Sequence, residues 1–160
     1  MDKNEILKEL LEQENTLVFT EFSFDKAYAL GTLLYERAKE RKFPIAIDIT
    51  KSNQQMYHAA LPGSTPDNDQ WIIRKSRVVN RFHHSSFYIH NLLESLDTTI
   101  EEKYCLSSFE YSPHGGSFPI IIKDVGVIGT ITVSGLPQKD DHAFVTSIIE
   151  EYLNSLNIHS

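Results

Sequence analysis

Hydrophobic and polar positions follow two different periods along the chain, and these periods predict a mixture of helices and strands. Spacings of three and four place Ile6, Leu7, Leu10 and Leu11 on one stripe, which predicts a helix over residues 2–14. Strict alternation predicts a strand over residues 44–50, with Ile45, Ile47 and Ile49 on one face. Ala46, Asp48 and Thr50 share the other face of that strand.

Four further stretches have the helical period. A helix over 24–42 is capped by Ser23, and the small residues Ala27, Gly31 and Ala38 on one face allow a close neighbour. The next helix starts at Asp67, which has a capping-box spacing to Gln70. A short helix follows the cap Ser85–Ser86, and a terminal helix covers 139–156 with two acidic residues in its first turn.

The remaining ordered stretches have strand character. Residues 54–61 follow a turn at Ser52-Asn53, and residues 117–135 predict a second hairpin with a turn at 123–126. Hairpins favour a mostly antiparallel sheet, so we expect an α/β (α+β) fold in one domain over 1–160. Residues 97–113 have a mixed pattern that favours neither helix nor strand.

The composition of the chain excludes several classes of protein. The apolar share of 41% and charged share of 23% are typical of a soluble globular domain. No apolar run approaches a membrane span, and the charged N-terminus is unlike a secretion leader, so we expect a cytoplasmic protein. The lone cysteine, Cys105, excludes a disulfide framework and reads as a small buried hydrophobe. A net charge of −7 argues against nucleic acid as a partner.

The charge is uneven, because the middle third is the one part that is not acidic. Arg74, Arg77 and Arg81 form a basic strip along one predicted helix. Guanidinium groups hold carboxylates or phosphates well, but a strip of this kind can also be a solvated face or a subunit contact. Lys75 differs, because it falls on the apolar side of the helix and needs either a route to solvent or a buried partner.

The sequence His114-Gly115-Gly116-Ser117 precedes the second hairpin. Two glycines permit positive φ and a close backbone approach, and their N–H groups can form an anion-binding nest. The alternative is a tight turn with a capping histidine. We expect any ligand site to lie where His114, Gly115, Gly116 and Ser117 converge with Arg74 and Lys75.

The histidines do not predict a metal site. His83, His84 and His90 lack the i, i+4 spacing of a helical zinc site, so no metal ligand is assigned. His58 or His114 could each ligate a haem iron singly, and the same two are the obvious acid–base candidates. No catalytic residue is assigned.

The stretch from His114 onward resembles the signature of the GlcG/HbpS-like superfamily of haem-degrading and haem-binding domains. The matching features are the double glycine before Pro119-Ile120, Gly126 and Gly129, Val133-Ser134-Gly135, and Gln138 with Asp141-His142. Upstream, Gly63-Ser64-Thr65-Pro66-Asp67-Asn68 and Trp71-Ile72 resemble a branch of short uncharacterised proteins in that superfamily. The resemblance covers about residues 5–155.

The resemblance implies a profilin-like fold, with an antiparallel sheet of about five strands and helices on both faces. It also implies a homo-oligomer, a dimer or larger. Haem binding or degradation belongs to other branches, and no haem ligand of theirs maps onto a matching residue here. The cofactor is therefore unknown, and haem is a possibility through the resemblance alone.

Three functions follow from these features. The first is an oligomeric binding protein for a small anionic or haem-like ligand, with Arg74 and Lys75 pairing its acidic groups. The second is an oligomeric scaffold or adaptor for protein partners, with the basic strip and Phe87-Tyr88 at subunit contacts. The third is an enzyme acting on haem or a small organic acid. We rank binding and adaptor roles above catalysis.

Overall fold

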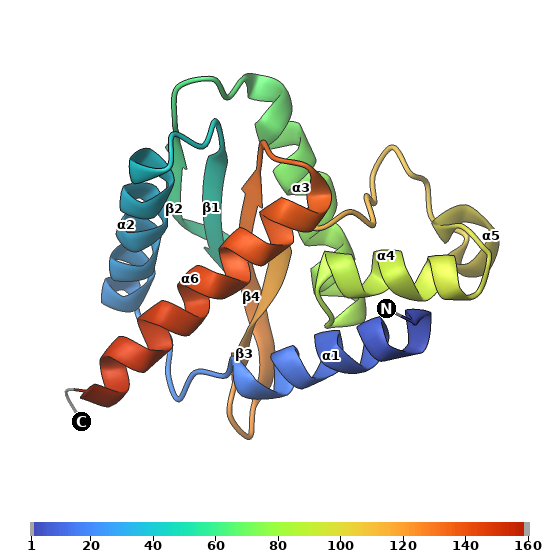
Figure 1. Cartoon of the computed structure of the whole chain (residues 1–160), viewed down its shortest axis with the longest axis horizontal. Coiled ribbons are helices and arrows are strands. Elements are labelled where there is room, and N and C mark those ends of the chain that lie inside the picture. The colour runs from blue at the N-terminus through green and yellow to red at the C-terminus, as the bar shows by residue number, and fades with distance from the viewer. Residues whose placement is uncertain (1, 159–160) are drawn as a thin grey trace.

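The computed structural model describes residues 2–158, with the side chains of 2–157, as six helices around one sheet (Figure 1). The helices are α1 (Lys3–Thr16), α2 (Phe24–Glu40), α3 (Pro66–Phe82), α4 (Ser86–Ser95), α5 (Ile100–Tyr104) and α6 (Gln138–Ile158). The strands are β1 (Ala46–Lys51), β2 (Gln54–Ala60), β3 (Ser117–Ile122) and β4 (Gly126–Ser134). None of the helices in this part of the chain is long and apolar enough to cross a membrane.

The sheet has the order β2-β1-β4-β3, and every neighbouring pair is antiparallel. The expectation of about five strands is wrong, because the described chain forms four. The segment before α2 lies along the outer edge of β3, but it makes a single bridge between Phe19 and Ile122. Two backbone hydrogen bonds, from Phe19 to Ile121 and from Lys123 to Phe19, fix that bridge before the chain turns into α2.

Both predicted hairpins are present. Ser52 and Asn53 have φ of 50° and 65°, the positive values that a two-residue hairpin turn between twisted strands requires. Asp124, with φ of 62°, lies in the turn between β3 and β4. The central pair β1 and β4 joins the two hairpins into one sheet, with Ala46 opposite Ser134.

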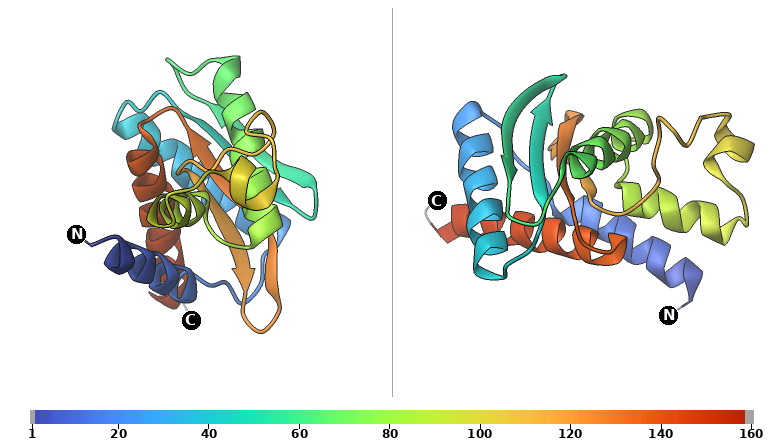
Figure 2. Two further views of the ribbon diagram at one scale, coloured as in Figure 1. Left: turned by 90° about the vertical axis from the view of Figure 1, so that its right-hand side faces the viewer. Right: turned by 90° about the horizontal axis from the view of Figure 1, so that it is seen from above.

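The two faces of the sheet differ in chemistry, as the alternation in β1 predicts. The main core lies between one face and the helices α2 and α6, while α3 crosses the opposite face (Figure 2). Ile45, Ile47 and Ile49 are fully buried in that core. The face beneath α3 carries buried polar side chains, namely Asp48, Ser117, Thr130, Thr132 and Ser134.

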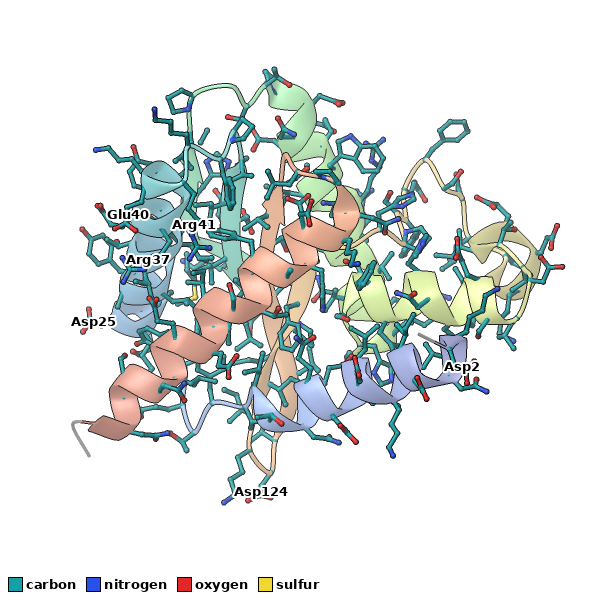
Figure 3. All side chains as sticks on the ribbon, viewed as in Figure 1. Asp2, Asp25, Arg37, Glu40, Arg41 and Asp124 are labelled. Carbon is teal, nitrogen blue, oxygen red and sulfur yellow. The ribbon has the colours of Figure 1, made fainter. Side chains whose placement is uncertain are left out.

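Helices α2 and α6 are also linked at their surface. Arg37 donates from Nε to Glu151 of α6 at 3.1 Å and from Nη1 to Glu40 of its own helix at 3.0 Å (Figure 3). These side chains are partly exposed, so the ion pairs contribute little to stability compared with the core beneath them.

Three local predictions are wrong. The capping pair of α3 is Thr65 and Asn68 rather than Asp67 and Gln70, because Pro66 starts the helix and Asn68 Oδ1 accepts the Thr65 N–H at 2.8 Å. Residues 100–104 form α5, whose Ile100 enters a second apolar cluster with α3 and α4. Cys105 ends α5 in a left-handed conformation and is exposed, not buried.

Helix α1 is held largely by polar contacts at its C-terminal end. Glu14 is buried, and its carboxylate pairs with His84 Nδ1 at 2.7 Å and accepts the Ser85 N–H at 3.2 Å. His142 of α6 faces Gln13 Oε1 through Nε2 at 2.8 Å, and burial lowers the pKa of that imidazole to about 4. Neutral His142 therefore donates to Gln13 at physiological pH.

The small residues of α2 allow the close approach that the sequence predicts. Ala27, Gly31 and Ala38 are buried, and a Cβ on Gly31 would meet the Tyr57 ring of β2 at 2.3 Å. We expect Gly31→Ala to lower the free energy of unfolding, because overpacking costs about 1–3 kcal/mol against about 1 kcal/mol gained in helix propensity.

Removing the ring should reverse the sign. In a Tyr57→Ala background the clash is absent, so Gly31→Ala should stabilise by up to about 1 kcal/mol. Urea denaturation of the four proteins measures both effects. A Gly31→Ala substitution that stabilises the wild-type background would contradict this account of the α2–β2 contact.

Candidate functional site

Lys75 is the buried charge of α3, and its partner lies on α6. Its side chain is 4% exposed, and Nζ donates to Asp141 Oδ2 at 3.0 Å and to the Val133 carbonyl at 3.2 Å. The position on the apolar side of α3 predicts either a route to solvent or a buried partner, and the structure has the partner. This contact joins α3, the end of β4 and the start of α6.

Asp141 is held in place by the backbone of the turn between β4 and α6. Its Oδ1 accepts the Leu136 N–H at 3.0 Å, and Oδ2 accepts the Gly135 N–H at 3.4 Å. Burial raises the pKa of Asp141 and lowers the pKa of Lys75, and in both cases desolvation outweighs the attraction between the two groups. Burial therefore brings the neutral amine and neutral acid closer in free energy to the ion pair.

The surrounding fold explains why the His114–Ser117 turn contains two glycines. Gly116 has φ of +136°, and a Cβ there would meet the Val133 carbonyl at 2.5 Å and Lys75 Nζ at 2.7 Å. The Gly115 N–H donates to Gln138 Oε1 at 3.0 Å. The close approach that the glycines permit is thus to the chain itself, beside the lysine.

A cavity of about 300 Å³ opens beside the Lys75–Asp141 pair. It is bounded by α3, by the His114 turn and by the turn that leads from β4 into α6. Its lining residues are Asn68, Trp71, Lys75, His114, Ser134, Gly135, Leu136, Gln138 and Asp141. The structure therefore brings Lys75 and His114 to one cavity, while Gly116 lies directly behind the amine.

Four of the six predicted site residues lie outside the lining of this cavity, namely Arg74, Gly115, Gly116 and Ser117. Ser117 is buried in the sheet, where its hydroxyl pairs with Thr132 Oγ1 at 2.8 Å and its N–H donates to Ser86 Oγ at 3.1 Å. Arg74 stacks with its guanidinium carbon 4.4 Å from the centre of the Trp71 ring. Trp71 in turn meets the His114 ring edge to face at 5.6 Å, which puts Arg74 at the rim.

The three arginines of the basic strip make different contacts. Arg77 donates to the Glu110 carbonyl at 3.3 Å, and Arg81 lies over the Tyr111 ring, so both are engaged with the loop after α5. The buried Nε of Arg74 has no hydrogen-bond partner among the described residues. Among the three arginines of the strip, Arg74 is the one that stacks on Trp71 of the cavity lining.

Basic side chains gather around the cavity although the chain is acidic overall. Burial and the charges of His90, Lys75 and Arg74 lower the pKa of the half-buried His114. His90 contacts the Pro113 carbonyl at 3.1 Å and Gln138 at 3.3 Å, which fixes it behind the His114 turn. Against these cationic groups the lining holds one carboxylate, Asp141.

Comparison with known proteins assigns the family. The family described as "Haem degrading protein HbpS-like" matches residues 22–150. This chain belongs to the HbpS-like family. A UPF0303 protein of Streptomyces coelicolor is 51% identical over 145 residues, covering 91% of this chain and 92% of its own. One from Paraburkholderia phytofirmans is 42% identical over 153 residues, covering 96% and 93%.

Solved structures confirm the HbpS-like fold. The crystal structure of the Ybr137w protein is similar with a TM-score of 0.84 at 36% identity, covering 94% of this chain and 89% of that one. A complex of PduOC with haem has a TM-score of 0.67 at 15% identity, covering 81% and 93%. At that identity the second likeness concerns the fold alone.

The HbpS-like family name implies haem, but the cavity of this chain does not fit an enclosed haem. Its volume is at the lower end of ligand pockets, and its lining mixes polar and apolar surface. His114 is half-buried against Trp71 and surrounded by cations, while His58 is paired with Asp69 at 2.7 Å away from the cavity lining. Within the described residues no three His, Cys, Asp or Glu side chains gather to hold a metal ion.

The sequence alone did not mark Trp71, Gln138 and Asp141 as site residues. Gln138 and Asp141 belong to the Gln-x-x-Asp-His motif of the HbpS-like resemblance, so that motif was an available signal. Trp71 reads as an apolar residue of α3, and only the packing of His114 and Arg74 against its ring gives it a place at the cavity.

We expect Asp141→Ala to lower the free energy of unfolding by about 3–5 kcal/mol, because it leaves the Lys75 charge buried without a partner. Asp140→Ala, one residue earlier and exposed, should cost less than about 1 kcal/mol through the helix dipole. Chemical denaturation of the two variants measures the difference. Equal losses would mean that the Lys75–Asp141 contact contributes no more than a surface charge.

Proposed function

We propose that this HbpS-like protein binds a small organic anion in the cavity beside Lys75, and that it does so as a homo-oligomer. The observation that carries the proposal is the charge of the site. In a chain of net charge −7, the basic residues Lys75, Arg74, His90 and His114 gather at a cavity whose lining has one carboxylate, Asp141, already paired with Lys75. A ligand that carries a carboxylate would balance the positive charge of these groups.

The side chains have distinct parts in this binding. Hydrogen bonds within the described chain occupy two of the three donor positions of the Lys75 ammonium, which leaves one for a ligand. Arg74, which stacks on Trp71 of the lining, supplies a second cation next to the cavity. Trp71 and His114 form a rigid aromatic wall against which a planar group can lie.

The volume of the cavity favours a ligand smaller than a porphyrin. About 300 Å³ accommodates a small acid, whereas a haem would need a larger and more apolar slot. A haemin titration distinguishes the two ligands. A Soret shift that disappears in His114→Ala would put haem at this site and overturn the small-anion proposal.

A scaffold role is the second candidate, and exposed aromatic side chains on α2 favour it. Phe24 and Tyr28 are 64% and 67% exposed, next to Tyr57 at the sheet edge. Aromatic surface of this kind is enriched at protein interfaces. The basic strip is a weaker candidate for subunit contacts than the sequence indicates, because Arg77 and Arg81 are already engaged within the chain.

The anion site predicts a difference between two arginines of one helix. We expect Arg74→Ala to weaken binding of a small carboxylate, tested with lactate and benzoate, by about tenfold or more, the range for a hydrogen bond to a charged group. Arg77→Ala is the matched control, one turn away and bonded to a loop carbonyl, and should leave the affinity unchanged.

Isothermal titration calorimetry at low ionic strength measures both variants. Inorganic phosphate in the same titrations tests whether the site prefers a carboxylate. Equal weakening by the two substitutions would point to a diffuse attraction by the strip, and no binding to the wild-type protein would refute the proposal.

The pH dependence of binding follows from His114. Burial and neighbouring cations lower the pKa of His114 in the free protein. A bound anion offsets the neighbouring positive charge and therefore raises that pKa. Protonation and anion binding therefore favour each other, so the affinity should rise as the pH falls through the pKa of His114. His114→Gln should flatten this dependence in the same titrations, and an unchanged slope would assign it to another group.

A further inference from the structure

Lys75 has the setting of a reactive amine, and this inference rests on the proposed anion site. We propose that Lys75 forms a Schiff base with the carbonyl carbon of a small 2-oxo acid bound in the cavity. The side chain lies in the cavity wall but is almost closed to bulk water. A carbonyl compound would thus reach the amine through the cavity.

The contacts of Nζ define the direction of attack. Its Cε and the two hydrogen bonds, to Asp141 at 3.0 Å and to the Val133 carbonyl at 3.2 Å, occupy three of the four tetrahedral positions. Gly116 lies behind the amine with no side chain, where a Cβ would be 2.7 Å from Nζ. The fourth position is the one available to a reacting carbon.

Asp141 is the group that takes the proton of the ammonium. Its Oδ2 is already hydrogen-bonded to Nζ, and transfer of that proton gives a neutral amine beside a neutral acid. Burial favours this neutral pair, since it lowers the pKa of Lys75 and raises the pKa of Asp141. The neutral amine keeps two N–H groups, one of which donates to the Val133 carbonyl. Rotation about the Cε–Nζ bond then brings the lone pair from the Asp141 side to the fourth position.

The atoms balance without an oxidant or reductant. The Nζ lone pair forms the N–C bond, and the carbonyl π pair moves to oxygen, which takes the proton that the now cationic nitrogen loses, to give a neutral carbinolamine. The C–O bond then breaks as the Asp141 acid protonates the leaving hydroxyl, and water departs. The product is a protonated imine paired with the Asp141 carboxylate, so the charge of the original pair is conserved.

The surroundings select an acid with an adjacent carbonyl. Arg74, stacked on Trp71, is a cationic partner for the carboxylate, and His114 becomes one when it is protonated, while Lys75 lines the same cavity. A 2-oxo acid has its carboxylate and its electrophilic carbon one bond apart, which suits a cavity of about 300 Å³.

Reductive trapping with pyruvate tests the proposal directly. The full-length protein is incubated with pyruvate and sodium cyanoborohydride, which reduces an imine to a stable secondary amine, and peptide mass spectrometry locates the adduct. We expect the modified fraction at Lys75 to exceed that at exposed lysines such as Lys123 severalfold. Modification spread evenly over exposed lysines, or none at Lys75, would overturn the proposal without requiring any variant to fold.

Variants and a matched ligand sharpen the result. Lys75→Arg retains the charge but cannot form the imine, so the adduct at that site should disappear while other lysines react as before. Asp141→Asn, if folded by circular dichroism, should slow trapping because the proton acceptor is lost.

Lactate, which has a hydroxyl in place of the carbonyl, separates failure of this inference from failure of the proposed function. Lactate binding without an adduct at Lys75 would refute the Schiff base and leave the anion site intact. No lactate binding and no adduct would refute both proposals. An adduct at Lys75 without measurable lactate binding would support the amine chemistry and count against a general anion site.

Discussion

The ion pair between Lys75 and Asp141 is the constraint on which the arrangement of the site depends. Two charges withdrawn from water oppose folding unless each is fully bonded, and here the carboxylate accepts from the lysine and two backbone amides. Such a pair adds little net stability compared with apolar side chains of the same size. Its effect is geometric, because only one docking of α3 against the β4–α6 turn satisfies all of its partners.

The division of the sheet into an apolar and a polar face explains why the cavity lies under α3. On the apolar face α2 and α6 pack side chains into a continuous core that excludes water. On the other face the hydroxyls of Thr132, Ser117 and Ser134 and the carboxylate of Asp48 are buried, and α3 covers them with a mixed surface. Polar groups that must be satisfied pack less completely than hydrocarbons, and the gap at the end of β4 is where the cavity opens.

Much of the fold follows from periodicity, and the site follows only in part. The alternation in β1, the turn at Ser52-Asn53 and the unusual place of Lys75 on an apolar stripe are local features, so they are readable from the chain. The meeting of Lys75 and His114 at one cavity was predictable from the two glycines after His114, which indicate a close contact of the backbone there. The contacts of Arg77 and Arg81 depend on a loop over 105–113 that has no periodicity. The burial of Ser117 depends on Ser86 and Thr132, which are distant in the sequence. The expectation of a fifth strand came from the family resemblance rather than from periodicity, because the alternating pattern itself predicts the four strands that the structure has.

The strand order β2-β1-β4-β3 has a consequence for how the chain assembles. Each hairpin can form from neighbouring residues, but the central pairing joins Ala46 to Ser134 across most of the sequence. A ribosome has therefore released almost the entire chain before the two hairpins can meet, and the helix that follows them must then close the core. The first helix to emerge, α1, can meet the N-terminal end of α4 through Glu14 and His84 earlier, but its contact between Gln13 and His142 must wait for α6. Until then the apolar faces of two separate hairpins are exposed to the cell, which makes the interval before closure the stage most prone to misassembly.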